Sequence, residues 1–579
     1  MPATYDRRKF MTYFAGIGLG STLLPGILWA KTSDGVELTT ATIAAAEEMA
    51  GLKFDEAERT MMLDGLKQQE GRIEALHKVV IANSVSPAIV FDPVPPGMVV
   101  PREAKRTMVR SAASVRSVPH SDEEIAFLPV TDLSELIRRR QLSATRLTGI
   151  YLDRLKKYDP VLHCVISLTE DRARARAKAA DAEIAAGRYR GPLHGIPWGA
   201  KDLLAVKGYK TTWGAGPYRE QVIDEDATVV QRLDAAGAIL VAKLTLGELA
   251  QGDVWFGERT RNPWKVDQGS SGSSAGPASA TAGGLVAFSI GSETLGSISS
   301  PSTVCGTTGL RPTYGRVPKT GAMALSWTMD KLGPICRSAE DCALVLDAIH
   351  GPDGHDKSAI ASSFNWNAKV SPKQLRVGYI KSAFDTPLTD PKDEKRTLHG
   401  TKQWDDAALG VLRGMGVNLI PVELPDMPYD AMRIILTAEA AAAFDDLTRS
   451  NRDAGLVQQG KFDWSNTFRT ARFIPAVDYI NANRVRSMAI EAWDDLMKKV
   501  DVIVTPTSAA NLAQLVATNL TGHPALILPN GFRPDGTPVS LTFLGGLFQE
   551  AKLLAVANAY QQATTFHKLH PTIPATPAK

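Results

Sequence analysis

The sequence predicts an α/β fold in which strands and helices alternate along one large globular unit. Apolar residues make up 44% of the 579 residues and charged residues 22%, which is typical of a globular chain with a sizeable core. Short apolar runs at residues 238–242 and 501–505 indicate buried strands, and each follows a segment with helical spacing, at 229–236 and 485–499. Helices that alternate with buried strands are the pattern of an α/β layout.

Residues 1–30 resemble a twin-arginine export signal. Arg7 and Arg8 precede a mildly apolar stretch at residues 11–29, and a cleavage site follows Ala30. A membrane anchor is the alternative, because the stretch approaches the ~20 residues that a spanning helix needs, but its glycines and its proline weaken that interpretation. We therefore expect a bacterial protein that is periplasmic or secreted, with no stable membrane insertion once the signal is removed.

Residues 31–127 are expected to form a helical extension and a proline-rich linker. Residues 40–51 are rich in alanine, and residues 54–83 carry apolar side chains at helical spacing. Three prolines and a glycine at residues 91–97 predict a linker laid over the surface. Oligomerisation, a lid and simple packing all stay open as roles for this region.

The core is expected to begin near Leu128. Asp132 can cap a helix at residues 133–140, and Ser143 can cap one at residues 144–158. Thr169 then starts an alanine- and arginine-rich helix that extends to residue 187.

A run of small and hydroxyl side chains at residues 268–306 is the candidate site. It contains the apolar segment 285–290, which a flexible linker would lack, so we interpret the run as buried structure. A tight turn at residues 291–298 would aim the backbone amides of Thr294, Leu295, Gly296 and Ser297 at a developing oxyanion. No histidine occurs in the run, which leaves an upstream lysine, Lys201, as the base for a serine nucleophile.

Several ordered motifs resemble the amidase signature family. They are residues 272–276 (Gly-Ser-Ser-Ala-Gly), 291–298, the pair Cys305-Gly306 and residues 309–317, with further matching segments at 191–201, 330–334, 505–507 and 519–525. A set in this order is far more specific than one short motif. The resemblance implies a large mixed β-sheet sandwiched by helices, as one amidase signature domain at residues 128–579.

The family uses a triad of serine, cis-serine and lysine. By resemblance, Ser297 is the acylated nucleophile, Lys201 is the terminal base and Ser273 relays the proton between them. The family places the relay serine 24 residues before the nucleophile, which matches Ser273 without a gap and leaves Ser270 as the alternative. Lysine acts as a base only when neutral, and burial in the apolar surroundings of residues 196–204 would lower its pKa.

Two positions depart from the usual family pattern. Leu295 stands where glycine is common, which leaves the donating backbone amides in place. Ser299 stands where arginine is common, which removes a charge that could contact substrate or scaffold. Substrate preferences of relatives with charged substrates therefore transfer poorly.

Other chemistries are less well supported. Residues 272–276 also fit the nucleophile elbow of α/β-hydrolases, with Ser274 as nucleophile, but a polar stretch precedes them where an apolar strand is required. The ten histidines are scattered and the four cysteines lack zinc spacing, so we expect neither a metal nor a cofactor. The cysteines are expected to be free thiols, although export would permit a disulfide. A net charge of +3 gives no reason to expect nucleic-acid binding.

We therefore expect an amidase that hydrolyses the C–N bond of a small-molecule amide through an acyl-enzyme on Ser297. One alternative is the glutaminase subunit of a tRNA-dependent amidotransferase, against which export and Ser299 argue. Another is a non-catalytic binding protein on the same fold. A homodimer and the identity of the substrate stay open, and residues 379–507 are expected to carry much of the variable substrate pocket.

Overall fold

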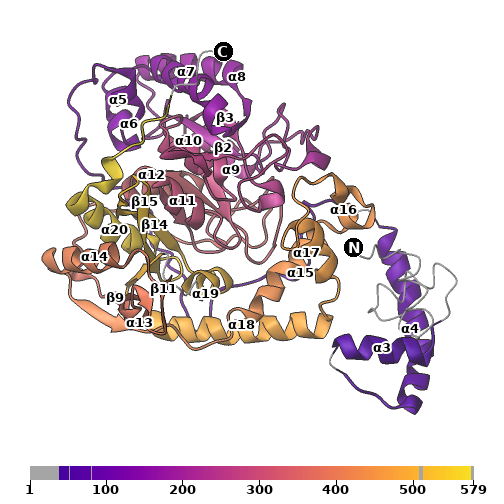
Figure 1. The fold of residues 1–579 in the computed structure, drawn as a ribbon. Helices are drawn as coiled ribbons and strands as arrows, with labels where there is room; N and C mark the ends of the chain where they lie inside the picture. Colours follow the sequence, from indigo (N-terminus) through magenta and orange to yellow (C-terminus); the bar gives the residue numbers. More distant parts are fainter. Residues whose placement is uncertain (1–37, 51, 80, 508–512, 575–579) are drawn as a thin grey trace, which may run out of the picture.

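The computed structural model describes residues 38–50, 52–79, 81–507 and 513–574, so the expected export signal lies outside the described residues. A mixed sheet of eleven strands forms the centre of the molecule (Figure 1), in the order β1-β3-β2-β6-β8-β7-β14-β15-β13-β9-β12. The expected large mixed sheet is thereby confirmed. Its strands are β1 (Val165–Leu168), β2 (Pro197–Lys201), β3 (Ile239–Leu244), β6 (Phe288–Glu293), β7 (Thr308–Arg311), β8 (Lys331–Cys336), β9 (Val377–Ile380), β12 (Leu419–Val422), β13 (Val502–Pro506), β14 (Ala525–Phe532) and β15 (Pro538–Gly545).

Helices flank the sheet, as expected from the alternating pattern (Figure 1). They are α5 (Asp122–Ala126), α6 (Val130–Arg138), α7 (Ala144–Leu162), α8 (Glu170–Ala185), α9 (Thr228–Ala235), α10 (Ala275–Ala282), α11 (Ser299–Cys305), α12 (Ala339–Ile349), α13 (Lys381–Asp385), α14 (Lys402–Gly414), α15 (Ile434–Ala443), α16 (Asp445–Arg449), α17 (Trp464–Ala471), α18 (Ala476–Met497), α19 (Ala513–Thr521) and α20 (Glu550–Thr564). Two small hairpins, β4–β5 (Arg261–Asn262 and Lys265–Gly269) and β10–β11 (Thr389–Asp390 and Asp393–Thr397), lie outside the main sheet.

Strands β2 and β6 position the site. They are neighbours and run parallel, with Trp198 opposite Phe288 and Ala200 opposite Ile290. Because parallel neighbours end at the same edge of a sheet, Lys201, the last residue of β2, lies beside the end of β6. Every residue of both strands is buried, which keeps water from this edge.

The helix ends show which capping predictions hold. Ser143 caps α7 as predicted, since its hydroxyl accepts a hydrogen bond from the Arg146 amide at 3.0 Å. The prediction for Asp132 is wrong: α6 begins at Val130, and Asp132 lies inside it and instead accepts a 2.6 Å hydrogen bond from the Ser114 amide. The carboxylate is thus used to hold the preceding linker rather than a helix end.

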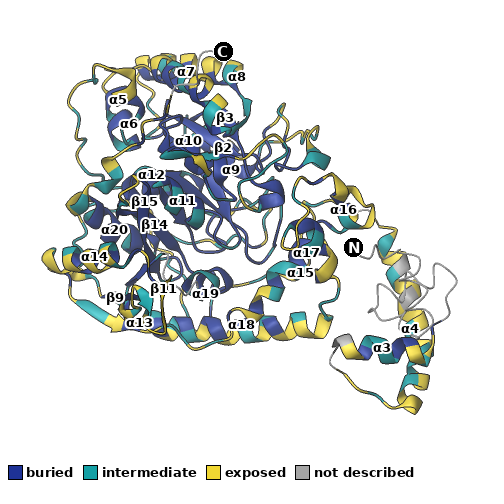
Figure 2. Cartoon of the chain, in the orientation of Figure 1, coloured by how far each residue is buried: buried dark blue, intermediate teal, exposed yellow. Residues whose placement is uncertain are grey.

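Two helices of the N-terminal extension, α3 (Thr40–Ala50) and α4 (Glu56–His77), project from the body (Figure 1). Helix α4 begins with a capping box in which Asp55 and Glu58 each accept a hydrogen bond from the other's amide. It ends at His77, six residues before the predicted end, and it is largely exposed whereas the sheet is buried (Figure 2). Within the described ranges, none of the helices combines the length and the apolar character that crossing a membrane requires.

Candidate active site

Lys201 is fully buried at the end of β2 and is surrounded by serine hydroxyls. Its Nζ atom lies 2.8 Å from Oγ of Ser273, 2.9 Å from Oγ of Ser292 and 3.1 Å from Oγ of Ser274. Burial lowers the pKa of Lys201 well below its usual value, and the negative charges of nearby carboxylates oppose this only in part. A lysine in such surroundings can hold a neutral amine that accepts a proton.

Ser273 follows a cis peptide bond after Gly272 and lies in the loop that leads into α10. Its hydroxyl is the group nearest to the Lys201 amine. The alternative relay residue, Ser270, is directed elsewhere, because its hydroxyl donates to the Ser271 carbonyl oxygen at 2.9 Å. The structure therefore brings Lys201 to Ser273 and not to Ser270.

Ser297 lies in the turn between β6 and α11, and it is 8% exposed. A backbone hydrogen bond of 3.0 Å from the Ser274 amide to the Ser297 carbonyl oxygen ties this turn to the loop of Ser273. In the described part of the chain, the Ser297 hydroxyl forms no hydrogen bond with Ser273 or Lys201. Catalytic hydrogen bonds are often long in structures without substrate, and the hydroxyl is free to rotate.

The turn also presents backbone amides. The amides of Leu295, Gly296 and Ser297 have no acceptor among the described residues, and Gly296 adopts a positive φ of 90° that favours glycine. Amides left open beside a nucleophile are the donors that an oxyanion hole requires.

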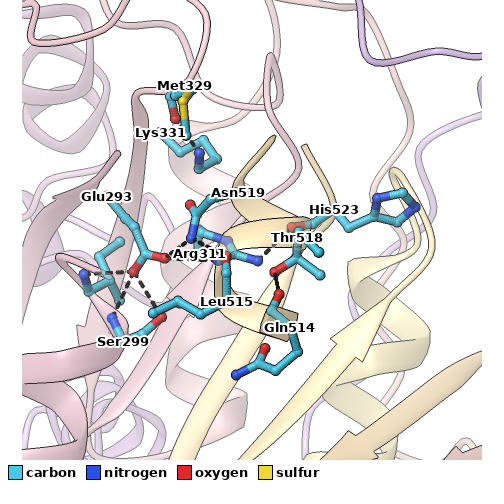
Figure 3. A network of polar contacts seen from close by, with 12 residues as sticks. Glu293, Ser299, Arg311, Met329, Lys331, Gln514, Leu515, Thr518, Asn519 and His523 are labelled. Atoms are coloured by element: carbon cyan, nitrogen blue, oxygen red, sulfur yellow. Dashed lines mark hydrogen bonds and ion pairs between the residues drawn. The ribbon is translucent and has the colours of Figure 1, made fainter. Parts of the chain in front are cut away.

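A buried carboxylate holds the residues directly after Ser297 (Figure 3). Oε2 of Glu293 accepts hydrogen bonds from the amides of Ile298 and Ser299, each 2.8 Å long, and a third from the Ser299 hydroxyl. Its other oxygen, Oε1, pairs at 2.8 Å with Arg311 and at the same distance with the amide nitrogen of Asn519. The start of α11 is thus fixed to the end of β6.

Charge in this network is balanced. Burial alone would raise the pKa of Glu293, but Arg311 and the hydrogen bonds from Asn519 and the Ser299 amide lower it to about 2. Ser299, the departure from the family pattern noted above, is therefore a hydrogen-bond donor to the scaffold. Arg311 supplies the positive charge from β7.

Two residues that contact Lys201, Ser292 and Ser274, were not predicted to do so from the sequence. Ser292 is uncharged and contacts the Lys201 amine twice, through its hydroxyl and, at 3.5 Å, through its carbonyl oxygen. Ser274 bridges Lys201 and the backbone of Ser292, accepting from its amide and donating to its carbonyl oxygen, each at 3.1 Å. The hydroxyls were visible in the motifs, but only the pairing of β2 with β6, and the hydrogen bonds that tie the start of α10 to Ser292, bring them to the lysine.

A cavity of about 340 Å³ opens beside this cluster. Ser292, Thr294 and Asp330 line it, together with the apolar Leu203 and Leu325. Thr294 donates to Asp330 at 2.6 Å, so the carboxylate is already paired. Residues 379–507, all of them described, are not among the residues that line this cavity, and the expectation that they carry much of the variable substrate pocket stays a prediction.

The described residues meet the requirements of neither a metal site nor a disulfide. Across the described ranges, no three His, Cys, Asp or Glu side chains lie together in a way that could hold a metal ion. The four cysteines are buried and free, as the default prediction stated, with Cys305 near the Ser270 carbonyl oxygen.

The chain is similar to a known protein family and to several known proteins. A family model described as Amidase matches residues 146–518. The A subunit of glutamyl-tRNA(Gln) amidotransferase from Coxiella burnetii is 32% identical over 493 residues, which cover 77% of this chain and 99% of that protein. The protein of the same name from Halorhodospira halophila is 34% identical over 488 residues, which cover 76% of this chain and 98% of that protein.

The solved structure of native peptide amidase from Stenotrophomonas maltophilia shares the fold as well. It is 30% identical, with a TM-score of 0.66, and the match covers 78% of this chain and 99% of that one. The family model spans more than half of the chain and these relatives are covered almost completely. The chain therefore belongs to the amidase family, as its signature motifs implied.

Proposed function

We propose that this protein hydrolyses carboxylic amides through an acyl-enzyme on Ser297, with Ser273 and Lys201 as the proton relay. The observation that carries the proposal is the buried Lys201 amine, which lies 2.8 Å from the Ser273 hydroxyl. A backbone hydrogen bond from Ser274 ties the loop of Ser273 to the turn that contains Ser297. A serine hydroxyl is a weak nucleophile and needs a base to take its proton. A lysine kept neutral by burial is such a base.

The steps follow from these positions. Ser297 attacks the amide carbonyl carbon while its proton passes to Ser273, and the Ser273 proton passes to the Lys201 amine. The relay then returns a proton to the leaving nitrogen, the C–N bond breaks, and ammonia or an amine departs. Water, deprotonated through the same relay, hydrolyses the ester on Ser297 and restores the enzyme.

The backbone of the turn would stabilise the negative oxygen of the tetrahedral intermediate. Its open amides at Leu295, Gly296 and Ser297, with Thr294 beside them, are the proposed donors. Removing one such donor in other enzymes costs about 3 kcal/mol of transition-state stabilisation. The Glu293 carboxylate would act indirectly, by holding the amides that follow Ser297.

Two substrate classes compete. The relatives named as amidotransferase A subunits favour glutamine, whose side-chain amide would be hydrolysed within a complex with further subunits. The similarity to peptide amidase favours a free linear amide. Recognition of glutamine also requires a partner for its α-carboxylate, and the residue two positions after Ser297 is an uncharged Ser299 that donates to Glu293. We propose export from the signal at residues 1–30, which would separate the protein from tRNA in the cytoplasm.

The test measures ammonia or amine release by purified protein from glutamine and from a panel of alkyl, aryl and peptide amides. Hydrolysis of simple amides, with glutamine poor, would favour the free amidase. Glutamine hydrolysis that rises when partner proteins are added would favour the amidotransferase role. A protein that hydrolyses neither and is not labelled by a fluorophosphonate would be a non-catalytic binding protein.

A further inference from the structure

The N-terminal extension reaches the cavity beside Lys201. Asn83, Ser84 and Ser86 line this cavity, although they are more than a hundred residues from the other residues that form it. We call residues 81–86 the strap. A hydrogen bond from the Val85 amide to the Ala82 carbonyl oxygen, 3.0 Å long, closes a turn that places Asn83 and Ser84 at its tip.

Asn83 fastens the strap to the cavity wall. Its amide nitrogen donates to the Ala324 carbonyl oxygen at 2.9 Å, and its Oδ1 accepts from the Ala324 amide at 2.7 Å. A weaker third contact, 3.4 Å, runs to the Ala443 carbonyl oxygen. Between residues 81 and 90, Asn83 is the one residue that is not exposed. One side chain therefore anchors this part of the chain.

The wall to which Asn83 is bound is itself tied to the site. The Met323 amide donates to the Leu203 carbonyl oxygen at 3.0 Å, and the Leu325 amide donates to Asp330 at 2.8 Å. Asp330 in turn accepts from Thr294, which belongs to the turn of the proposed oxyanion hole. Hydrogen bonds, joined by the peptide link between Ala324 and Leu325, thus connect the strap to that turn.

Both flanks of the strap are also held. Before it, the His77 carbonyl oxygen accepts from Arg449 at 3.2 Å. After it, the ring of Phe91 packs edge-on against Tyr314, with centroids 5.0 Å apart, and lies under the guanidinium of Arg486 at 3.4 Å. These contacts fix where the chain passes the cavity.

We propose that the strap is a wall of the substrate cavity that limits the size of the substrate group held there. This inference rests on the proposed amide hydrolysis. The cavity of about 340 Å³ is near the small end of ligand pockets, which hold roughly 300–1,000 Å³. Other lining residues belong to strands and to loops that hydrogen bonds hold to the body, so the strap, held at its tip by Asn83, is the wall that a larger group would meet. The protein is thus assigned compact amides as substrates.

The experiment uses the full chain and two series of amides, linear alkanamides from acetamide to decanamide and N-alkyl acetamides of the same lengths. We measure kcat/KM for ammonia or amine release by wild type, Asn83→Ala and Asn83→Asp. In one of the two series, Asn83→Ala should raise the ratio of kcat/KM for long amides to kcat/KM for short amides by at least about 10-fold. One methylene provides discrimination of this size in an apolar pocket. Asn83→Asp keeps the acceptor for the Ala324 amide and should give a smaller rise.

Asn365→Ala is the matched control. Asn365 clamps the same N-terminal extension to the body by bonding the Arg106 amide at 2.8 Å and the Ala104 carbonyl oxygen at 3.2 Å, away from this cavity. The Asn365→Ala variant should leave the ratio of kcat/KM for long and short amides unchanged. As a second variant, Ser84→Trp should lower the ratio, because it adds bulk where the strap lines the cavity.

The outcomes separate the two claims. An active wild type whose ratio is the same in Asn83→Ala and Ser84→Trp, in both series, would overturn the strap inference alone. A wild type that hydrolyses no amide and takes no ethyl fluorophosphonate on Ser297 would overturn the proposed function, and the inference with it. If the ratio rises equally in Asn83→Ala and Asn365→Ala, the variants loosen the N-terminal extension in general, and this result would also overturn the inference.

Discussion

The Lys201 amine and the Ser273 hydroxyl lie 2.8 Å apart, and both groups are shielded from solvent. Their contact joins the end of β2 to the loop before α10, which are separated by 72 residues in the sequence. The proposed chemistry depends on this pair, because the relay needs a neutral amine beside a hydroxyl.

The first prediction concerns pH. Because burial lowers the pKa of Lys201, the amine is neutral above that lowered pKa, and kcat/KM should fall on the acid side as the lysine is protonated. In Lys201→Met the residual activity should be low and should lack this acid limb. A pH profile of amide hydrolysis checks both statements, and an unchanged acid limb in the variant would exclude Lys201 as the titrating base.

Stability should respond to the same group with a definite sign. Between the lowered pKa of Lys201 and its ordinary value of 10.5, the unfolded chain binds a proton that the folded chain does not. The free energy of unfolding contributed by this lysine therefore rises with pH across that window. Lys201→Met should flatten this rise in denaturant titrations at several pH values.

The second prediction separates two neighbouring serines. Ser273→Ala should lower kcat by about 10²–10⁴-fold, the usual contribution of a positioned proton-transfer group. Ser270→Ala should stay close to wild type, since the Ser270 hydroxyl donates only to the Ser271 carbonyl oxygen. Steady-state kinetics of the pair decide the register, and the opposite ranking would move the relay to Ser270.

The third prediction concerns the turn before Ser297. At Gly296, with φ of 90°, an added Cβ would lie 3.1 Å from Oγ of Ser300 and 3.4 Å from a methyl carbon of Leu515. Gly296→Ala should strain the turn, displace the open amides and lower kcat at least about 10-fold, with KM less affected. Gly410→Ala in α14, where an added Cβ has no neighbour within 4 Å, is the control and should leave kcat unchanged.

The fourth prediction tests Glu293 as a positioning residue. Glu293→Gln leaves Arg311 without its charge partner, which should cost about 3–5 kcal/mol of stability. It should also lower kcat, because the amides of Ile298 and Ser299 lose their carboxylate acceptor. Glu293 has a pKa of about 2, so its stabilisation should persist above the usual carboxyl pKa of 4.5 and be lost as the pH falls toward 2.

A second buried pair provides the control for that variant. Glu550 pairs with Arg316 at 2.9 Å, and both are fully buried. Glu550→Gln should destabilise the fold by a similar amount while kcat at a permissive temperature stays near wild type. If both variants lose kcat equally, Glu293 acts on stability only.

The sequence was informative where short-range chemistry decides the outcome. The alternation of strands and helices, the Ser143 cap and the buried surroundings of Lys201 follow from local pattern, and the structure bears them out. Asp132 was misassigned because a helix start and a loop anchor use the same carboxylate chemistry, and only the approach of Ser114 distinguishes them.

Long-range pairing accounts for the rest. The contribution of Ser292 to the lysine depends on the register of β2 with β6, and the role of Asn83 depends on a contact across 241 residues. Neither leaves a signal in a single sequence. The expectation that residues 379–507 carry much of the substrate pocket stays a prediction.

The most direct test of the account is mass spectrometry of the protein after reaction with ethyl fluorophosphonate, run beside hydrolysis of a responsive amide. Wild type should carry one adduct on Ser297, and Ser297→Ala should carry none and should hydrolyse the amide no faster than buffer. An adduct on another serine, or amide hydrolysis that persists in Ser297→Ala, would contradict the proposed mechanism.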